Sequence, residues 1–251
     1  MTRRTDLIAA FLLLIFLGTE TFLKASVPAS LLKSSALVVC VLSWLFIVFY
    51  FSRNSELWAS FSTPAASSKR TFYVVAGIIV VGFIFRFWRL GSLFDGMAWD
   101  EAYKGLDALA IRIYGDRPVF LNWNAGREAL IAYLVVVFQW LFDYSIISVR
   151  GVLAFFGGLT LIVIFFLCRR LFNLHLALLT TFLLAVWKWH IIHTRYGVRV
   201  SLIIFFEVMV LFLLARGIQA NKRNSTSFAL AGFFGGLGLY TYIAYRIFPA
   251  I

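Results

Sequence analysis

Charged residues are scarce in this chain. Only 14% of its 251 residues are Asp, Glu, Lys or Arg, whereas about 25% is usual in a soluble globular domain. Hydrophobic residues make up 62% of the sequence, and the mean hydropathy is +0.92. These values exclude an ordinary soluble domain and indicate an integral membrane protein. Because the apolar runs are continuous and do not alternate with polar residues, the sequence predicts helices and excludes the strands of a membrane barrel.

Cysteine is almost absent as well. The sequence has two, Cys40 and Cys168, each within or at the end of an apolar run. Two isolated cysteines provide neither a metal-ligand spacing nor a disulfide framework. The net charge of +12 is compatible with nucleic-acid binding, but no RNA- or DNA-binding motif accompanies it. In a membrane protein such a charge reflects topology signals and contact with anionic lipids, so we expect lipid and not nucleic acid as a partner.

Seven apolar runs are long enough to cross a bilayer. They cover residues 7–23, 34–51, 71–90, 149–168, 173–189, 200–216 and 227–245. A further run, Ala129 to Phe142, has only about 14 residues, which predicts a helix at the membrane interface or a re-entrant segment. Arg3 and Arg4 before the first run also fit a signal peptide, but we expect a retained helix.

Basic residues decide which of these runs cross the membrane. With the N-terminus in the cytoplasm and the short run left out, every cytoplasmic segment is basic, as the positive-inside rule requires. These segments contain Arg3, Arg4, Arg53, Lys69, Arg70, Arg169, Arg170, Arg216, Lys222 and Arg223. If the short run crossed, the pairs Arg169–Arg170 and Lys222–Arg223 would face outward. The sequence therefore predicts a multi-pass protein of the inner or plasma membrane, with residues 129–142 along its outer face.

This topology brings four distant segments to the non-cytoplasmic side. They are the loop 91–127 with its adjacent acids Asp100 and Glu101, the stretch GREAL at 126–130, the stretch WKWHIIHTRYGVR at 187–199 and the stretch YTYIAYR at 240–246. Arginine at the membrane edge suits phosphate binding, because its guanidinium donates hydrogen bonds in pairs. A neighbouring carboxylate can take the proton of a hydroxyl. Such a base and such a clamp fit glycosyl transfer from a lipid phosphate, in which the departing phosphate gains negative charge.

Each of these features also has a purely structural explanation. Asp100 and Glu101 could do no more than stabilise the first turn of an interfacial helix, where acids are favoured. Arg86, at the end of the third run, is better explained as a side chain that reaches lipid headgroups. His190 and His193 suggest a metal site, but packing or hydrogen bonding is the more common role.

Two further features lie within the apolar runs. Glu207 falls in the middle of the run 200–216, where a carboxyl group must be paired, protonated or turned toward a cavity. Gly157, Gly158 and the glycines of the run 227–245 are expected to let helices approach closely. We do not interpret them as phosphate loops, because no strand and no Walker-type lysine accompanies them.

Several stretches, taken in order, resemble the GT-C-fold glycosyltransferases. They are RFWRLGSLFDGMAWDEAYKGLDA at 86–108, NWNAGREALIAYL at 122–134, SVRGVLAFFGGLTLIVIFFLCRRLF at 148–172, WHIIHTRYGVR at 189–199 and ALAGFFGGLGLYTYIAYRIFP at 229–249. The resemblance is to the bacterial branch of the protein O-mannosyltransferase and aminoarabinose transferase superfamily. It covers residues 71–251 and leaves residues 1–70 outside.

The resemblance implies an all-α polytopic fold of about seven transmembrane helices, with the interfacial helix 129–142 after an outer catalytic loop at 91–128. It further implies a glycosyltransferase that moves a hexose or pentose from a polyprenyl-phosphate donor to a lipid, glycan or protein acceptor in the cell envelope. Members of this superfamily have many more helices, so the chain is expected to be truncated. Two rival functions stay open: a transporter or flippase of polyprenyl-linked sugars, and an inactive remnant.

Roles for individual residues follow from the resemblance and from the outer position of the segments. Asp100 is expected to be the catalytic base, and Glu101 to orient Asp100 or the acceptor. The donor phosphate is expected to bind Arg127, Arg195, Arg199 and Arg246. Substrate contacts are expected from Tyr103, Lys104, Glu128, His193 and Tyr242. Some members of the superfamily place a carboxylate in the second outer segment, where this chain has none, so we assign no metal ligand and leave a divalent cation open as a cofactor.

Overall fold

A computed structural model describes residues 69–92, 96–122, 126–219 and 225–250. The predicted spans 7–23 and 34–51 lie outside the described residues, as do Cys40, Lys222 and Arg223.

Helices dominate this part of the chain. They are α4 (Lys69–Phe87), α5 (Trp99–Tyr114), α6 (Leu130–Phe142), α7 (Ile146–Leu171), α8 (Leu174–Val186), α9 (Lys188–Arg195), α10 (Val200–Ile218), α11 (Ser225–Gly238) and the 3-10 helix η1 (Ile243–Ala250). Between α5 and α6 the strands β1 (Phe120–Leu121) and β2 (Arg127–Glu128) pair antiparallel, with Phe120 opposite Glu128 and Leu121 opposite Arg127.

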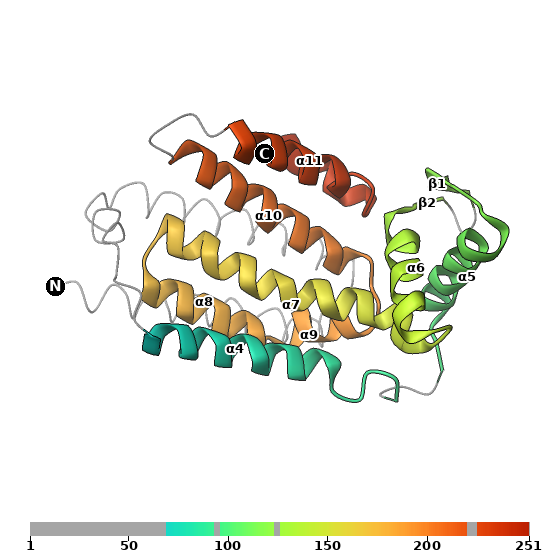
Figure 1. The fold of residues 1–251 in the computed structure, drawn as a ribbon, viewed down its shortest axis with the longest axis horizontal. Coiled ribbons are helices and arrows are strands. Elements are labelled where there is room, and N and C mark those ends of the chain that lie inside the picture. The colour runs from blue at the N-terminus through green and yellow to red at the C-terminus, as the bar shows by residue number, and fades with distance from the viewer. Residues whose placement is uncertain (1–68, 93–95, 123–125, 220–224, 251) are drawn as a thin grey trace, which may run out of the picture. The chain divides into compact units, whose positions relative to one another are not determined.

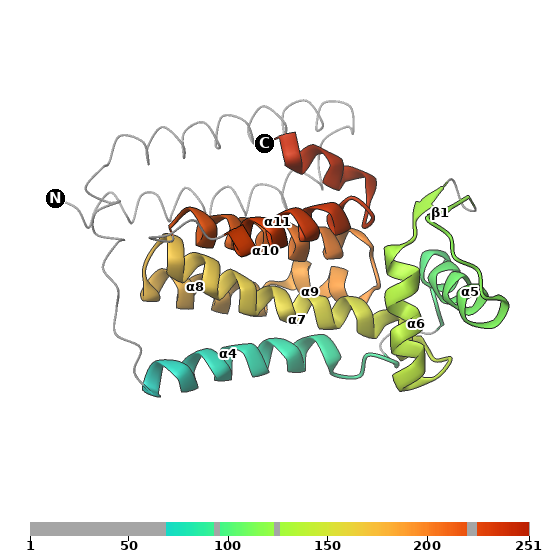
Figure 2. The same cartoon turned by 45° about the horizontal axis from the view of Figure 1, so that its top comes forward.

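Five helices form a bundle with α7 at its centre. Figures 1 and 2 show α7 and α8 between α4 on one side and α10 and α11 on the other. Between Gly151 and Cys168 helix α7 carries no charged residue, which is typical of a helix buried in the interior of a membrane bundle. Val149, Val152 and Leu153 of α7 pack with Leu202 and Phe205 of α10 in the main hydrophobic cluster. In contrast to α7, helix α4 has most of its surface exposed, as expected for a helix that faces lipid.

Three of the described helices, α4, α7 and α10, are long and apolar enough to cross a membrane. The predicted span 173–189 is broken: α8 and α9 form a pair bent by 53° around Trp187, whose backbone is extended. The predicted span 227–245 is not confirmed, because α11 ends at Gly238 after 14 residues. At about 1.5 Å per residue that helix is shorter than the hydrocarbon core of a bilayer. The described part of the chain thus holds three candidate spans, or four if the bent pair is one span.

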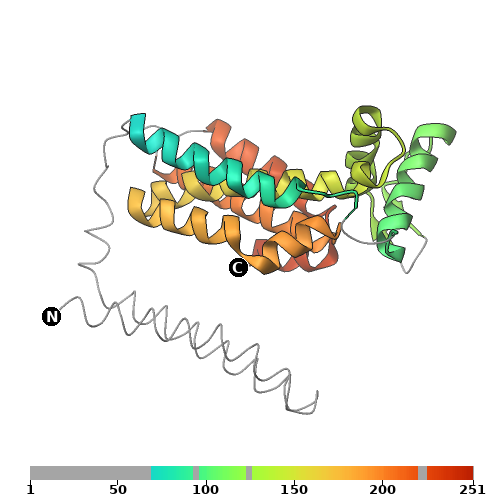
Figure 3. The same cartoon turned by 90° about the horizontal axis from the view of Figure 1, so that it is seen from below.

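Helices α5 and α6 lie at one end of the bundle, crosswise to its axes (Figures 1 and 3). Helix α4 ends and α7 begins at this same end (Figure 1), so the chain between them does not cross the bundle. This is the arrangement that the basic residues predicted for the short run 129–142. The opposite end of the bundle carries basic residues. Lys69 is the first residue of α4, the pair Arg169–Arg170 lies in the last turn of α7, and Arg216 lies in the last turn of α10.

Two adjacent glycines of α7 allow its neighbours to come close. A Cβ atom added at Gly158 would overlap the ring of Phe83 on α4, and one added at Gly157 would meet Thr194 of α9. At Gly232 of α11 no atom lies within 4 Å of an added Cβ. The prediction that these glycines serve packing is therefore confirmed for Gly157 and Gly158.

This difference predicts a contrast between two substitutions of the same kind. Gly158→Ala should lower the free energy of unfolding by about 1–3 kcal/mol, because the new methyl group forces α4 and α7 apart. Gly232→Ala is the control and should be neutral or slightly stabilising, because alanine favours the helix and meets no neighbour. Unfolding of both variants in detergent micelles measures the effect. Equal stability of the two would contradict the packing of α4 on α7.

Candidate functional site

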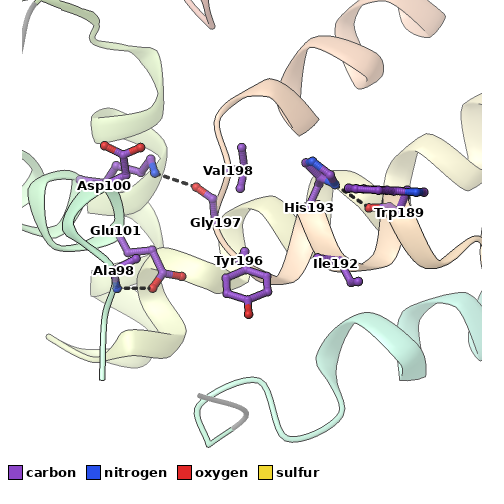
Figure 4. A pocket seen from close by; sticks show the side chains of 10 residues that line it. Ala98, Asp100, Glu101, Trp189, Ile192, His193, Tyr196, Gly197 and Val198 are labelled. Carbon is purple, nitrogen blue, oxygen red and sulfur yellow. Dashed lines mark hydrogen bonds between the residues drawn. The ribbon is translucent and has the colours of Figure 1, made fainter. Parts of the chain in front are cut away.

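A pocket of about 300 Å³ opens at the end of the bundle that carries α5 and α6. Its two walls are the first turn of α5 and the segment from α9 to the start of α10 (Figure 4). The lining residues are Ala98, Asp100, Glu101, Lys104, Trp189, Ile192, His193, Tyr196, Gly197 and Val198. Two of the four outer segments predicted from the sequence therefore meet in one cavity.

The adjacent acids of α5 lie in different surroundings. Asp100 is exposed and lines the pocket, whereas Glu101 is only 1% exposed. Glu101 accepts a hydrogen bond at 3.0 Å from the main-chain N–H of Ala98, just before the first turn of the helix. Acids are favoured there, because the free N–H groups and the helix dipole both attract negative charge. The structural explanation therefore applies to Glu101. Both acids line the pocket, and Asp100 is the more exposed of the two.

Arg150 of α7 holds Glu101 in place. Its Nε lies 2.8 Å from Oε1 of Glu101 and its Nη2 lies 2.9 Å from Oε2, and both side chains are 1% exposed. The same guanidinium donates to the carbonyl oxygens of Leu90 at 3.3 Å and Gly96 at 3.0 Å. One side chain thus ties α5 and the start of the loop before it to the central helix. No role for Arg150 was predicted from the sequence. The only signal was an arginine among apolar residues near the start of a run.

Lys104 joins the two walls of the pocket. It is 2% exposed, and its Nζ donates to the carbonyl oxygen of Gly197 at 2.7 Å. Gly197 has φ +65°, a conformation that favours glycine, and an added Cβ would lie 3.3 Å from Glu101. Burial lowers the pKa of Lys104 to about 8, against the opposing charge of Asp100. The positive charges of Arg199 and Arg127 lower this pKa further. Lys104 therefore changes charge close to neutral pH.

The other predicted segments meet beside the pocket in a group that we call the arginine cluster. It consists of Arg127, Glu128, Arg199 and Arg246. Glu128 is 7% exposed and lies between two arginines, with Nη1 of Arg199 at 3.6 Å and Nη2 of Arg246 at 3.7 Å. The stretches 126–130, 187–199 and 240–246 thus come together, as the topology predicted.

Helix α5 contacts the arginine cluster at Arg127 of β2. Nη1 of Arg127 lies 2.8 Å from Oδ2 of Asp107, and its guanidinium lies 5.2 Å from the ring centre of Tyr103. Burial raises the pKa of Asp107, and the charge of Arg127 opposes this effect. Similarly, the guanidinium of Arg199 lies 5.3 Å from the ring centre of Tyr242. In the arginine cluster three arginines stand against the carboxylates of Glu128 and Asp107, so this part of the site favours an anion.

Arg195 and His193, both predicted as site residues, also lie apart from the arginine cluster. Arg195 donates to the carbonyl oxygen of Phe85 at 2.9 Å and to that of Trp88, so its guanidinium lies at the end of α4. His193 lines the pocket, and its Nδ1 lies 2.8 Å from the carbonyl oxygen of Trp189. His190 hydrogen-bonds to Arg86, which agrees with its expected packing role. The prediction that Arg86 reaches lipid headgroups is wrong, because Arg86 is fully buried.

Within residues 69–92, 96–122, 126–219 and 225–250, no group of three or more His, Cys, Asp or Glu side chains is placed to hold a metal ion.

The buried pair of Arg150 and Glu101 yields a stability prediction. Arg150→Met should lower the free energy of unfolding by about 3–5 kcal/mol, because it leaves a buried carboxylate without its partner. Adding Glu101→Leu should restore part of this loss, since the double variant removes both charges of the buried pair. Arg89→Met is the control, because the side chain of Arg89 is exposed. Unfolding in detergent measures all three, and strictly additive losses would show that the two side chains do not depend on each other.

A comparison with known proteins finds a family for the second half of the chain. The family model described as oligosaccharyl transferase STT3, N-terminal, matches residues 120–251. No curated protein and no solved structure matches the chain. The match supports the GT-C class that the sequence resembles, but not the narrower bacterial branch. Because the matched residues are more than half of the chain, we conclude that this protein belongs to the family of the oligosaccharyl transferase STT3, which are membrane glycosyltransferases of the GT-C type.

Proposed function

We propose that the protein transfers a sugar from a polyprenyl-phosphate donor to a hydroxyl group of a lipid, glycan or protein acceptor. The observation that carries this proposal is the position of Asp100, which lines a pocket next to a group of arginines. A base and an anion clamp are the two elements that such a reaction needs. The STT3 match supports a lipid-linked donor, because proteins of that family use lipid-linked oligosaccharides.

Asp100 is the proposed catalytic base. Its carboxylate accepts the proton of the acceptor hydroxyl as the oxygen attacks the anomeric carbon of the sugar. The new bond joins that carbon to the acceptor oxygen, and the bond between the carbon and the donor phosphate breaks. Polyprenyl phosphate leaves with the bonding electron pair and with one more negative charge than it had in the donor. Glu101 does not take this proton in our proposal; through Arg150 it holds the first turn of α5.

The arginine cluster is the proposed site for the donor phosphate. Among the described residues none accepts a hydrogen bond from Nη1 of Arg199, although this atom is buried. The ion pairs of Arg199 and Arg246 with Glu128, at 3.6 and 3.7 Å, are longer than hydrogen bonds. These donors are therefore suited to a phosphate, which accepts from guanidinium groups in pairs. Glu128 keeps the two arginines together until the donor binds.

Lys104 stands between the pocket and the arginine cluster, so we propose that it contacts the sugar or the phosphate oxygen that leaves it. His193 lines the same pocket, and the ring of Tyr103 lies next to the guanidinium of Arg127. Both are assigned to the sugar or the acceptor. Tyr242 lies under Arg199 and is assigned to the donor. Arg195 hydrogen-bonds to the end of α4, and its role in binding the phosphate stays a prediction.

We further propose that the end of the bundle with α5 and α6 faces the non-cytoplasmic side of the inner or plasma membrane. Lys69, Arg169, Arg170 and Arg216 lie at the opposite end, where the positive-inside rule expects them. Helix α6 is apolar, has 13 residues and lies crosswise to the bundle, which suits a helix along the interface. In this proposal residues 71–251 form the catalytic core, with the loop 91–128 over the outer face.

Asp100→Asn tests the proposed chemistry. Replacing the base with an amide should lower the rate of sugar transfer by about 100-fold or more and leave donor binding unchanged, because the arginine cluster is intact. The assay uses sealed membrane vesicles, a radiolabelled polyprenyl-phosphate sugar and a cell-envelope extract as the acceptor. Right-side-out vesicles should accept sugar on their outer face, and inside-out vesicles should not.

Two outcomes of this assay would overturn the proposal. If Asp100→Asn moves labelled donor across the membrane as well as the native chain does, and neither transfers sugar, the protein is a transporter. If the native chain neither transfers sugar nor binds the donor, it is an inactive member of the family. Asp116→Asn is the matched control, because Asp116 is an exposed acid of the same outer segment that lies outside the pocket and the arginine cluster.

The pKa of Lys104 yields a second prediction. Because this pKa is lowered to about 8, Lys104 is charged at pH 7 and mostly neutral at pH 9. The affinity for the anionic donor should therefore fall as the pH rises through 8. Lys104→Arg should remove this fall, because the guanidinium stays charged over the whole range. Donor dissociation constants measured between pH 6.5 and pH 9.5, approximately the range that brackets the titration, check the effect. An unchanged pH profile in Lys104→Arg would exclude Lys104 as its source.

A further inference from the structure

Arg86 occupies a buried position at the break between α8 and α9. It extends from α4 and is fully buried. Its Nη1 donates to the carbonyl oxygen of Gly82 at 2.8 Å and to that of Ala185 at 3.3 Å. Its Nη2 donates to the carbonyl oxygen of Leu184 at 3.2 Å. A single guanidinium therefore serves the last turn of a helix from which it is distant in sequence.

The break explains why α8 needs these donors. The last four carbonyl groups of a helix have no partner within that helix. At the end of a soluble helix water provides the missing hydrogen bonds, but inside a membrane bundle another protein group must do so. Helix α8 ends at Val186, and Leu184 and Ala185 belong to its last turn. Arg86 supplies the donors that a continuous helix would have had, and so stabilises the bend of 53°.

The same guanidinium also holds α9, the helix that forms one wall of the pocket. Nη2 of Arg86 lies 2.6 Å from Nδ1 of His190, which is 5% exposed. On the next turn, Thr194 packs where Gly157 of α7 leaves room, with 3.0 Å between the Cβ of Thr194 and a Cβ added at Gly157. An added Cβ at Gly157 would also lie 3.2 Å from Nε of Arg86. Contacts from α4 and α7 therefore fix the rotation of α9 about its axis.

A second arginine makes the reverse connection. Arg195, at the end of α9, donates to the carbonyl oxygens of Phe85 and Trp88 at the end of α4. Helix α4 thus provides an arginine for the carbonyl groups at the end of α8, and α9 provides one for those at the end of α4.

We infer that Arg86 is a positioning residue that sets the pocket wall on α9 opposite Asp100. Trp189 and His193 line the pocket and stand one residue before and three residues after His190. Any rotation of α9 that follows the loss of Arg86 would move both side chains relative to α5. The donor phosphate, by contrast, binds the arginine cluster, which Arg86 does not touch. This inference rests on the proposed function only for its activity measurement.

Arg86→Lys tests the inference, since it keeps the charge and removes the planar fork. We expect kcat for sugar transfer to fall by about 100-fold, as it does for small displacements of reacting groups, with KM for the donor unchanged. Arg170→Lys is the matched control. Arg170 also donates to two carbonyl groups at the end of a helix, those of Ala215 and Arg216, but at the opposite end of the bundle. It should lower thermal stability without changing kcat. Equal kcat in the two variants would overturn the inference.

A distance measurement tests the position of α9 without any activity. Spin labels are placed on exposed Lys188→Cys of α9 and exposed Leu171→Cys of α7, in a chain with Cys40 and Cys168 replaced by serine. Electron–electron double resonance should give one narrow distance distribution in the native background and in Arg170→Lys. In Arg86→Lys the distribution should shift or broaden. An unchanged distribution there would overturn the inference.

His190→Phe provides a second variant in case Arg86→Lys does not fold. It removes the acceptor on α9 and leaves the carbonyl partners of Arg86 in place, so it should shift the label distance and lower kcat in the same direction. A native kcat with a native distance distribution would show that the contact with His190 does not position α9. If the native chain itself transfers no sugar, the proposed function fails, whereas the label distances still decide the role of Arg86.

Discussion

The main-chain carbonyl groups at the ends of helices are the constraint on which the rest of this structure depends. Such groups lack partners within their own helix, and where a helix ends inside a membrane bundle no water replaces them. In this chain arginines from neighbouring helices provide the hydrogen bonds: Arg86 serves α8, Arg195 serves α4, Arg170 serves α10 and Arg112 serves α6. Arg150 does the same for the loop that leads into α5. The excess of basic residues is therefore more than a topology signal. Several of these side chains connect helices that would otherwise share only apolar contacts.

These connections explain how two neighbouring acids come to have separate tasks. Glu101 is bound on both oxygens by Arg150 and also accepts a hydrogen bond from the start of its own helix. Asp100, one residue earlier, lines the pocket and stays exposed. The buried pair fixes the direction of the first turn of α5, and that direction decides where Asp100 lies. Lys104, one turn later, then connects α5 to the segment beyond α9. The proposed base is held by neighbours that do not themselves react.

Hydrophobic runs and charge were enough to predict much of the architecture. They located α4, α7 and α10, the short helix α6, and the return of the chain to the same end of the bundle after α6. They also predicted that distant segments meet near Asp100 and Arg127. They could not predict the break at Trp187 or the early end of α11, because both depend on tertiary contacts in runs that are apolar throughout. For the same reason the burial of Arg86 and the role of Arg150 were missed: from sequence, an arginine at the end of an apolar run is equally compatible with lipid headgroups and with the carbonyl groups of another helix.

The Glu101–Arg150 pair has a consequence for exchanging parts between related enzymes. The STT3 match begins at residue 120, between the two halves of this pair and after Asp100. A chimaera joined at that boundary would combine an α5 from one parent with an α7 from the other. The proposed base would then rest on a foreign central helix, with a buried carboxylate facing whatever side chain that helix supplies. A chimaera that keeps the buried pair must take α5 and α7 from the same parent. The segment to exchange as a whole therefore begins before residue 120, where the family match begins.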